Sequence, residues 1–234
     1  MPVNSSFQIA NIVGYKFIFE PIKSNMYALV DQNEVLAIDT NISSDSLSFI
    51  DNHAADLWTA IFTHEHFDHI SGLNTIREKC SCKCIASIQS SENFGNMRKN
   101  MSAHYDALFI MRDEETQALA RSIVPNGYQA QPADIRFSGT MEFEWHGLYF
   151  KLQSTPGHTK GSICIVCNET HIFTGDTLVD GFPSVTKLPG GSKSDFEKYA
   201  IPFINSLPKD AIIYPGHGEI NPLRNFCVDW LLSN

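Results

Sequence analysis

Short polar turns rich in histidine and aspartate follow apolar runs at four places, and this pattern constrains the fold more than any other feature of the chain. The apolar runs LWTAIF, LYFKLQS, HIF and AIIY lead into Thr63-His64-Glu65-His66-Phe67-Asp68-His69, Thr155-Pro156-Gly157-His158, Thr174-Gly175-Asp176 and Pro215-Gly216-His217-Gly218. Each polar cluster thus stands where a buried strand is expected to end. In layered α/β folds such loops gather along one edge of the sheets, so residues far apart in sequence can converge there.

The apolar runs divide the chain into two similar halves. In the first half FQIANIV, YKFIFE, NMYALVD and EVLAIDT alternate with the turn-like GY, PIKS and QN, which predicts an antiparallel meander. A helix over 44–52, a strand over 57–62 and a helix after Asp68 follow. In the second half, strands at MEFEW, LYFKLQS, GSICIVC and HIF precede a helix over 195–206 and the strand AIIY. Two such halves predict an α/β fold: a four-layer αββα sandwich of two mixed β-sheets with outer helices.

The length of 234 residues favours one large domain over residues 1–234. Residues 88–124 are more polar and helical in pattern, and VPNGYQAQPAD then interrupts them. We therefore expect a helical cap inserted at about 88–130. The formal charge of −9 and the absence of a basic stripe argue against nucleic acid as a partner. No stretch has the roughly 18 apolar residues of a membrane span, and no leader pattern stands at the start, so we expect a cytoplasmic protein with no membrane partner.

The polar clusters contain the side chains that borderline and hard metal ions bind. Imidazole and carboxylate suit zinc, iron or manganese, and seven candidate ligands exceed what one tetrahedral site can use. We therefore expect two divalent metal ions, zinc first, with iron or manganese as alternatives. In two-metal sites a carboxylate can span both ions and a hydroxide between them can serve as the nucleophile. Asp176 is the candidate bridge, and Asp68 could orient the water.

These residues resemble the metallo-β-lactamase fold hydrolases, and the resemblance covers nearly the whole chain. It is carried by His64-x-His66-x-Asp68-His69 with His158, Asp176 and His217. The resemblance implies that His64, His66 and His158 hold one metal and that Asp68, His69 and His217 hold the other, with Asp176 bridging. Asp39, after EVLAI, matches an acidic residue of the family, and we expect it to accept a hydrogen bond from a ligating histidine.

Within this family the chain looks most like glyoxalase II-like enzymes. Three stretches carry the likeness: Asn100-Met101-Ser102-Ala103, Ser154-Thr155-Pro156-Gly157-His158-Thr159 and Leu188-Pro189-Gly190-Gly191. The chain departs from those enzymes at Ser184-Val185-Thr186-Lys187, where they usually carry Gly-Arg-Thr-Asp, and in lacking their long C-terminal helical domain, which grips glutathione. We therefore expect small acyl thioesters to be cleaved and S-lactoylglutathione to be a poor or middling substrate.

The leading hypothesis is a binuclear metal-dependent hydrolase of a small ester-like molecule, with a thioester as the first choice. The alternatives are a persulfide dioxygenase with a mononuclear iron on the positions of His64, His158 and Asp176, a lactonase, and a metal-binding or sensing protein without turnover. A nuclease loses weight because of the negative net charge. The expected partner is a small-molecule substrate, and a homodimer is an open alternative.

Other polar residues receive weaker assignments. Position alone makes Lys187, His104 and Tyr105 candidates for substrate contact. Cys80, Cys82 and Cys84 alternate as an edge strand with thiols on one face would, and Cys164 and Cys167 lie in a strand pattern, so we expect structural roles for all five. The remaining histidines, at positions 53, 146 and 171, are expected to be solvated and to have no acidic neighbours.

Overall fold

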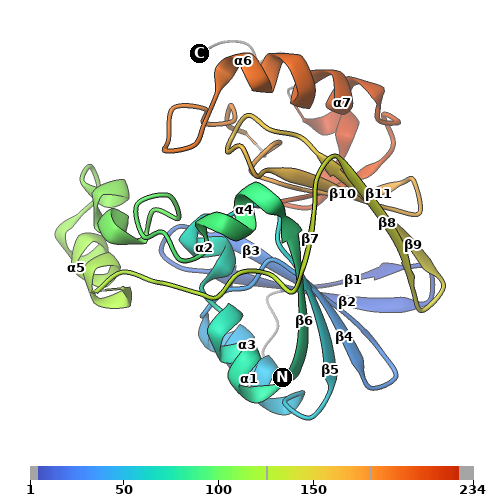
Figure 1. Ribbon diagram of the computed structural model, residues 1–234, viewed down its shortest axis with the longest axis horizontal. Helices are drawn as coiled ribbons and strands as arrows, with labels where there is room; N and C mark the ends of the chain where they lie inside the picture. Colours follow the sequence, from blue (N-terminus) through green and yellow to red (C-terminus); the bar gives the residue numbers. More distant parts are fainter. Residues whose placement is uncertain (1–4, 125, 180, 227–234) are drawn as a thin grey trace.

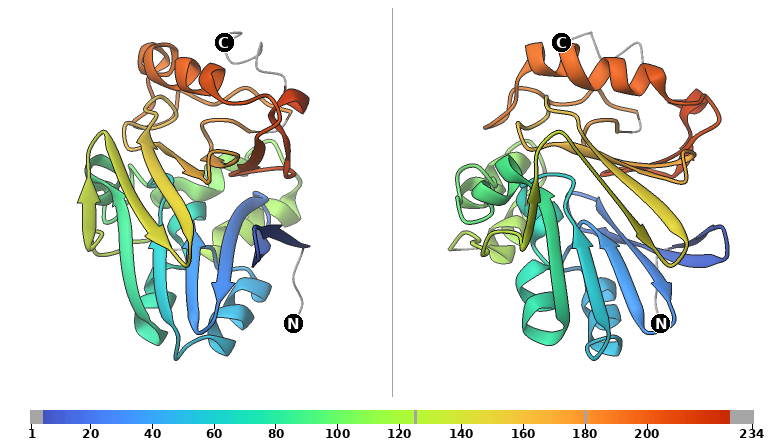
Figure 2. Two further views of the ribbon diagram at one scale, coloured as in Figure 1. Left: turned by 90° about the vertical axis from the view of Figure 1, so that its right-hand side faces the viewer. Right: turned by 45° about the vertical axis from the view of Figure 1, so that its right-hand side comes forward.

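Two β-sheets face each other and carry helices on their outer sides (Figures 1 and 2). The computed structural model describes residues 5–124, 126–179 and 181–226. Within these residues the first sheet has seven strands in the order β1-β2-β3-β4-β5-β6-β7, and the second has six in the order β13-β12-β11-β10-β9-β8. The predicted four-layer αββα fold class is confirmed.

The first sheet begins as an antiparallel meander and ends in parallel strands. Its strands are β1 (Ser5–Ile9), β2 (Ile12–Phe19), β3 (Ser24–Asp31), β4 (Glu34–Ile38), β5 (Leu57–Ile61), β6 (Ser81–Ser87) and β7 (Ile135–Phe137). The parallel strands are connected by α1 (Ser44–Asn52), α2 (Phe67–Ile70) and α3 (Leu73–Lys79). The Ser43 hydroxyl caps α1 by accepting the Ser46 N–H.

One predicted turn of the meander was wrong. The sequence suggested a turn at Gly14-Tyr15, but the chain reverses at Ala10, which has φ 53°, and Gly14 lies inside β2. The Phe7 ring on β1 packs directly on Gly14, where a Cβ atom would stand 2.3 Å from the ring. The glycine therefore permits a close strand-to-ring approach and does not form a turn.

The second sheet repeats the scheme with an antiparallel meander and one parallel crossover. Its strands are β8 (Thr140–Trp145), β9 (Leu148–Ser154), β10 (Ile163–Cys167), β11 (His171–Gly175), β12 (Ile212–Pro215) and β13 (Asn221–Pro222). The crossover from β11 to β12 runs through α6 (Lys193–Asp195), the π-helical η2 (Phe196–Ala200) and α7 (Ile201–Ser206), and the short η3 (Leu223–Asn225) follows β13. The π-helical stretch precedes Pro202, which has no N–H to donate to the preceding turn.

Apolar side chains fill the space between the sheets and beneath the helices. Between the sheets, Leu36 and Ile61 of the first pack with Phe150 and Phe173 of the second, and each is fully buried. Separate clusters join α1 and α3 to the outer face of the first sheet, and the β11–β12 crossover to the second. With both faces covered, the parallel strands present their carboxyl ends as the open edge for polar loops.

The segment expected to form a cap contains α4 (Ile88–Asn93), the 3-10 helix η1 (Ser102–Phe109) and α5 (Glu114–Ile123). The latter two protrude from the body of the molecule at the left of Figure 1. Tyr105 and Phe109 of η1 pack against Phe67, the first residue of α2. The chain returns through the three-residue β7, which the sequence analysis did not predict. Its Ile135, Arg136 and Phe137 pair with the last three residues of β6.

The strand β6 is not the edge strand of its sheet, contrary to the prediction, because β7 pairs with its last three residues. Cys80 ends α3, Cys82 and Cys84 lie in β6, and β7 is too short to reach beside them. Cys164 and Cys167 lie in β10 as expected, and burial raises the pKa of both thiols to about 12. The structural prediction for this strand is confirmed.

The expectation that His146 has no acidic neighbour was also wrong. Its Nδ1 lies 3.1 Å from a carboxylate oxygen of Asp31, and its Nε2 lies 3.0 Å from one of Glu34. The β8–β9 turn thus meets the β3–β4 turn, a contact between sheets that local sequence does not reveal. His53 and His171 are also partly buried, and they face the Phe49 carbonyl and the Tyr214 hydroxyl.

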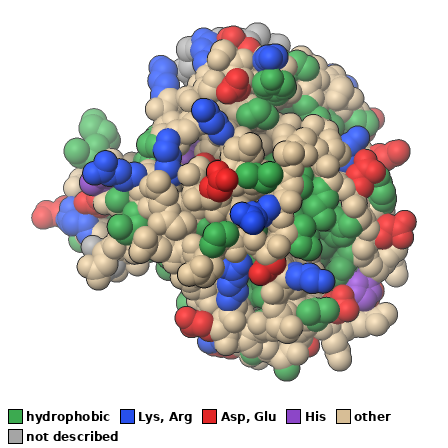
Figure 3. Space-filling view, in the orientation of Figure 1, with side chains coloured by type: hydrophobic (Ala, Val, Ile, Leu, Met, Phe, Trp, Pro, Cys, Tyr) green, Lys and Arg blue, Asp and Glu red, His purple; other side chains and the backbone are tan. Residues whose placement is uncertain are grey.

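The surface gives two further observations. On the face shown in Figure 3, Lys and Arg side chains stand apart from one another, and hydrophobic side chains reach the surface of the protruding cap. In the described part of the chain, every helix is too short or too polar to cross a membrane.

Candidate metal centre

The seven predicted ligands come from four loops that leave strands of both sheets. His64 and His66 follow β5, with Asp68 and His69 in α2 directly behind them, and three further loops follow β9, β11 and β12. The structure brings all seven side chains together. Three groups have ligand atoms within 4.8 Å of one another: His64, His66 and His158; His64, His69 and Asp176; and Asp68, His69 and His217.

Asp176 lies between the ligand groups. One carboxylate oxygen is 3.4 Å from His69 Nε2, and the other is 3.5 Å from His158 Nε2 and 3.4 Å from His217 Nε2. Asp68 Oδ2 lies 3.3 Å from His69 Nε2 and 3.5 Å from His217 Nε2. A carboxylate so placed can reach two ions at once.

Hydrogen bonds on the far side of four imidazole rings turn Nε2 toward the centre. Nδ1 of His69 lies 2.8 Å from Asp39 Oδ2, and Nδ1 of His64 lies 3.1 Å from the Thr63 hydroxyl, which itself donates to Asp39. The Nδ1 atoms of His158 and His217 face the carbonyl oxygens of Val185 and Ile22 at 2.8 and 3.2 Å. With its proton on Nδ1, each ring offers the Nε2 lone pair to a metal.

The donor atoms that face the centre fit metal ions. Nε2 of His64 and His69, Oδ2 of Asp68 and Oδ1 of Asp176 are buried and have no hydrogen-bond partner in the described residues. Nδ1 of His66 stands 3.0 Å from Nε2 of His158. Buried polar atoms are rarely left unpaired, and a cluster of them lacking only a positive charge is typical of a metal site.

Burial and charge divide the five imidazoles into two classes. Burial lowers the pKa of His64 and His158, and that of His66 to about 3, so these rings are neutral at physiological pH. Burial opposes the charge on His69 and His217 as well, but Asp68 and Asp176 outweigh it and raise the pKa of both.

Burial would also raise the pKa of the carboxyls, but the neighbouring histidines outweigh it. They hold the pKa of Asp68 at about 2 and that of Asp176 well below its usual range. The protons on His69 and His217 thus supply positive charge at the positions where bound metal ions would supply it.

A cavity of about 510 Å³, here called the metal cavity, opens above these groups. His66, Asp68, His158, Asp176 and His217 form its floor, and its walls come from the β2–β3 turn, the cap and the segment 182–188. The cap therefore overhangs part of the candidate centre. The cap contributes Arg112, Leu108 and Met101; the sequence predicted no contact with substrate for these three, and Met101 was named only as part of a family-like stretch.

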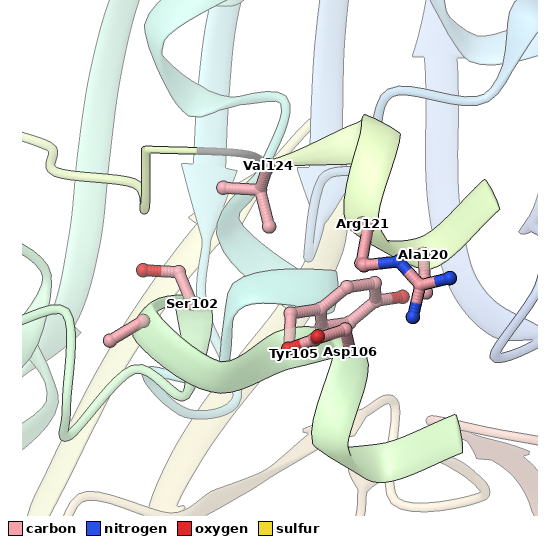
Figure 4. Close-up of a pocket in the computed structure, with 7 residues that line it drawn as sticks. Ser102, Tyr105, Asp106, Ala120, Arg121 and Val124 are labelled. Atoms are coloured by element: carbon pink, nitrogen blue, oxygen red, sulfur yellow. The ribbon is translucent and has the colours of Figure 1, made fainter. Parts of the chain in front are cut away.

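The three residues assigned to substrate contact by position lie elsewhere. His104 and Lys187 are exposed and do not line the metal cavity. Tyr105 is 2% exposed and lines a second cavity, of about 320 Å³, between η1 and α5. Figure 4 shows it there with Ser102 and Asp106 on η1, beside Ala120 and Arg121 of α5. Its ring supports α2, which carries Asp68 and His69.

Comparison with known proteins agrees with this geometry. The sequence model of the metallo-beta-lactamase superfamily matches residues 20–217. The chain belongs to this superfamily. It is 26% identical over 206 residues to a probable metallo-hydrolase of Streptococcus pyogenes, with 87% of this chain and 83% of that protein covered.

Two further relatives extend the likeness. A hydroxyacylglutathione hydrolase of Pelagibacter ubique is 26% identical over 207 residues, with 86% and 70% covered. The crystal structure of the BLEG-1 B3 metallo-beta-lactamase superposes with a TM-score of 0.71 at 21% identity, with 91% and 95% covered. Members of the superfamily bind divalent metals, and the His and Asp groups of this chain are of the kind that hold them.

Residues outside the superfamily motifs hold the His217 loop in place. Lys16, only 1% exposed, donates from Nζ to the Gly218 carbonyl at 2.8 Å, and the Asn25 amide donates to the carbonyls of Pro215 and Gly218. Tyr27 adds a hydroxyl bond of 2.7 Å to Pro215. The first sheet thus positions a ligand that the second sheet supplies. The signal available in the sequence was a single lysine within the apolar run of a predicted strand.

Glu65 is a second residue that the sequence analysis passed over, although it stands between two predicted ligands. Its carboxylate accepts the Thr159 hydroxyl at 2.8 Å and the Asn93 amide at 2.9 Å. It therefore joins the loop after β5 to the loop after β9 and to α4. Burial raises its pKa, and these two hydrogen bonds partly offset that effect.

Proposed function

We propose that this chain is a binuclear metal-dependent hydrolase of small thioesters. The observation that supports this most is the place of Asp176, whose two carboxylate oxygens face different histidines at the floor of an open cavity. Two bound divalent ions would supply a water of lowered pKa and positive charge for the oxygen that becomes negative during attack.

The chain's own residues have separable tasks in this proposal. His64, His66 and His158 would hold one ion, and Asp68, His69 and His217 would hold the other. Asp68 accepts a hydrogen bond from the attacking water and aims it at the carbonyl carbon. Asp39 and Thr63 keep the protons of His69 and His64 on Nδ1. Attack forms a carbon–oxygen bond and breaks the carbon–sulfur bond, and the products are a carboxylate, a thiol and a proton released to solvent.

The choice of a thioester is supported by the relative that is named a hydroxyacylglutathione hydrolase. Thioester cleavage needs only Lewis acidity, so zinc or manganese would suffice, whereas oxygen chemistry requires a redox-active iron. The partner in this proposal is a small molecule. Association into a homodimer stays a prediction, which light scattering can test.

The experiment is a panel of thioesters, lactones and glutathione persulfide presented to zinc-, manganese- and iron-loaded protein. Thiol release reports thioester hydrolysis, and oxygen uptake at an electrode reports persulfide oxidation. We expect thioester cleavage with zinc or manganese and no oxygen uptake. Oxygen consumption with persulfide by the iron form alone, together with inert thioesters under every metal, would replace this proposal with the dioxygenase.

A further inference from the structure

The charged residues that line the metal cavity are separated by sign, with the acidic ones on its floor and the basic ones on its walls. The acidic ones are Asp68 and Asp176, and both belong to the ligand groups on its floor. The remaining charged lining residues are Lys23, in the β2–β3 turn, and Arg112, in the cap. The chain as a whole carries a formal charge of −9, yet the walls that a substrate would meet carry positive charge.

Hydrogen bonds hold the backbone of Arg112, whereas its guanidinium group forms no ion pair within the described residues. Its N–H donates to the Phe109 carbonyl at 2.8 Å, and its own carbonyl accepts the Gln117 amide at 2.9 Å. The nearest acid in sequence, Asp113, is engaged in capping α5 through the Thr116 N–H and hydroxyl. Arg112 forms no ion pair with any acidic side chain in the described ranges, whereas Lys23 pairs with Glu20 at 3.0 Å.

The walls between these cations are apolar. Ile22, Met101, Leu108, Phe182, Val185 and Leu188 form most of them. Phe182 is 73% exposed and Leu108 38% exposed, so these side chains offer apolar surface that a ligand could cover. Burial of one methylene is worth up to about a fourfold gain in affinity. The cavity thus combines one free guanidinium with a surface suited to a hydrocarbon chain.

We propose that the substrate is a thioester that carries one carboxylate and an apolar acyl chain, and that Arg112 selects the carboxylate. This rests on the proposed thioester hydrolysis. A guanidinium fork matches a carboxylate in geometry, and a single unpaired cation matches a single negative charge better than the near-double charge of a phosphate monoester. The acyl chain lies along Leu108, Phe182 and Val185. Arg112 is a specificity residue and has no part in the attack itself.

The test uses two hexanoyl thioesters of one shape, those of 3-mercaptopropionate and 3-mercaptopropionamide. Arg112→Gln is compared with Arg121→Gln, which removes the same charge from the same cap but lines the second cavity. We expect Arg112→Gln to lower kcat/KM about fivefold to tenfold for the acid and less than twofold for the amide. Arg121→Gln should leave both within twofold. Equal losses for acid and amide, or equal effects of the two variants, would overturn the assignment of Arg112.

The chain-length part of the inference has its own arm. For the S-acetyl, S-butanoyl and S-hexanoyl thioesters of 3-mercaptopropionate, kcat/KM should rise with each added pair of methylenes. A flat or falling series would overturn the apolar acyl chain. Binding of the S-hexyl thioethers of the same two thiols, which cannot be hydrolysed, is measured by calorimetry. Acid-selective binding without turnover of any thioester would remove the hydrolase proposal and keep Arg112 as the anion contact. Equal binding of the acid and the amide would show that Arg112 does not select the carboxylate.

Discussion

Asp39→Asn tests how the protein prepares His69 to bind a metal. The Asp39 carboxylate accepts three hydrogen bonds, from the Thr63 N–H at 2.7 Å, the Thr63 hydroxyl at 2.7 Å and His69 Nδ1 at 2.8 Å. An asparagine has a single acceptor oxygen, which the Thr63 N–H would occupy. The amide NH₂ group would then face His69 Nδ1 and favour the proton on Nε2, the atom that a metal needs.

The structure allows the size of this effect to be set. Loss of a partner behind a ligating imidazole costs about 10- to 100-fold in metal affinity, which corresponds to about 1.4 to 2.7 kcal/mol. Because Asp39 is only 2% exposed, water is poorly placed to replace the lost hydrogen bond. We therefore expect one of the two zinc affinities, that of the ion beside His69, to fall by at least about tenfold.

The assay is a competition titration with a chromogenic zinc chelator, with circular dichroism to confirm the fold. Asp45→Asn, which removes the same charge from the first turn of α1, serves as the control and should leave both affinities within twofold. Zinc affinities of Asp39→Asn that match those of the control, in a folded protein, would show that Asp39 does not prepare His69 to bind zinc.

Three further predictions concern other parts of the centre. Gly216→Ala should reduce bound zinc, measured by elemental analysis, to one ion or fewer per chain. The new Cβ would stand 2.1 Å from Asp176 Oδ1 and 2.9 Å from His69 Cε1 and would displace these ligands. Two zinc ions per chain in this variant would contradict the need for glycine at position 216. Lys16→Met should lower the free energy of unfolding in urea by about 1 kcal/mol, because the Gly218 carbonyl loses one of its two donors and keeps only the Asn25 amide. No change in the free energy of unfolding would show that Lys16 does not hold the loop. Zinc binding at Asp68, His69 and His217 should weaken as pH falls. The pKa of both histidines is raised, so each holds a proton that the metal must displace below that pKa and holds none above it. Calorimetry in buffers of different ionisation enthalpy should show more proton release for this ion than for the one at His64, His66 and His158, where the pKa values are lowered; equal release would contradict the division.

The fold class could be predicted from sequence because the chain alternates apolar runs with turns in a simple order. The clustering of the predicted ligands at one site could be predicted for a related reason. Each follows an apolar run, and strand ends of a layered fold share an edge. The Gly14 turn failed because a glycine in a strand can mark either a turn or a close approach, and only the position of Phe7 decides between them.

Contacts between distant segments were beyond local patterns. The meeting of His146 with Asp31 and Glu34 depends on how the two sheets are set against each other. The support that Lys16 gives to the His217 loop spans 202 residue positions. Arg112 and Tyr105 illustrate the same limit in the cap, where the path of the chain decides which side chain faces the metal cavity and which faces α2.

The most direct test of the binuclear centre is anomalous diffraction from crystals of the zinc-loaded protein, recorded on both sides of the zinc edge. We expect two peaks per chain, about 3.5 to 4 Å apart. One should lie beside His64, His66 and His158 and the other beside Asp68, His69 and His217, with Asp176 between them. A single peak at full zinc loading, or two peaks with Asp176 turned away from one of them, would contradict the binuclear centre.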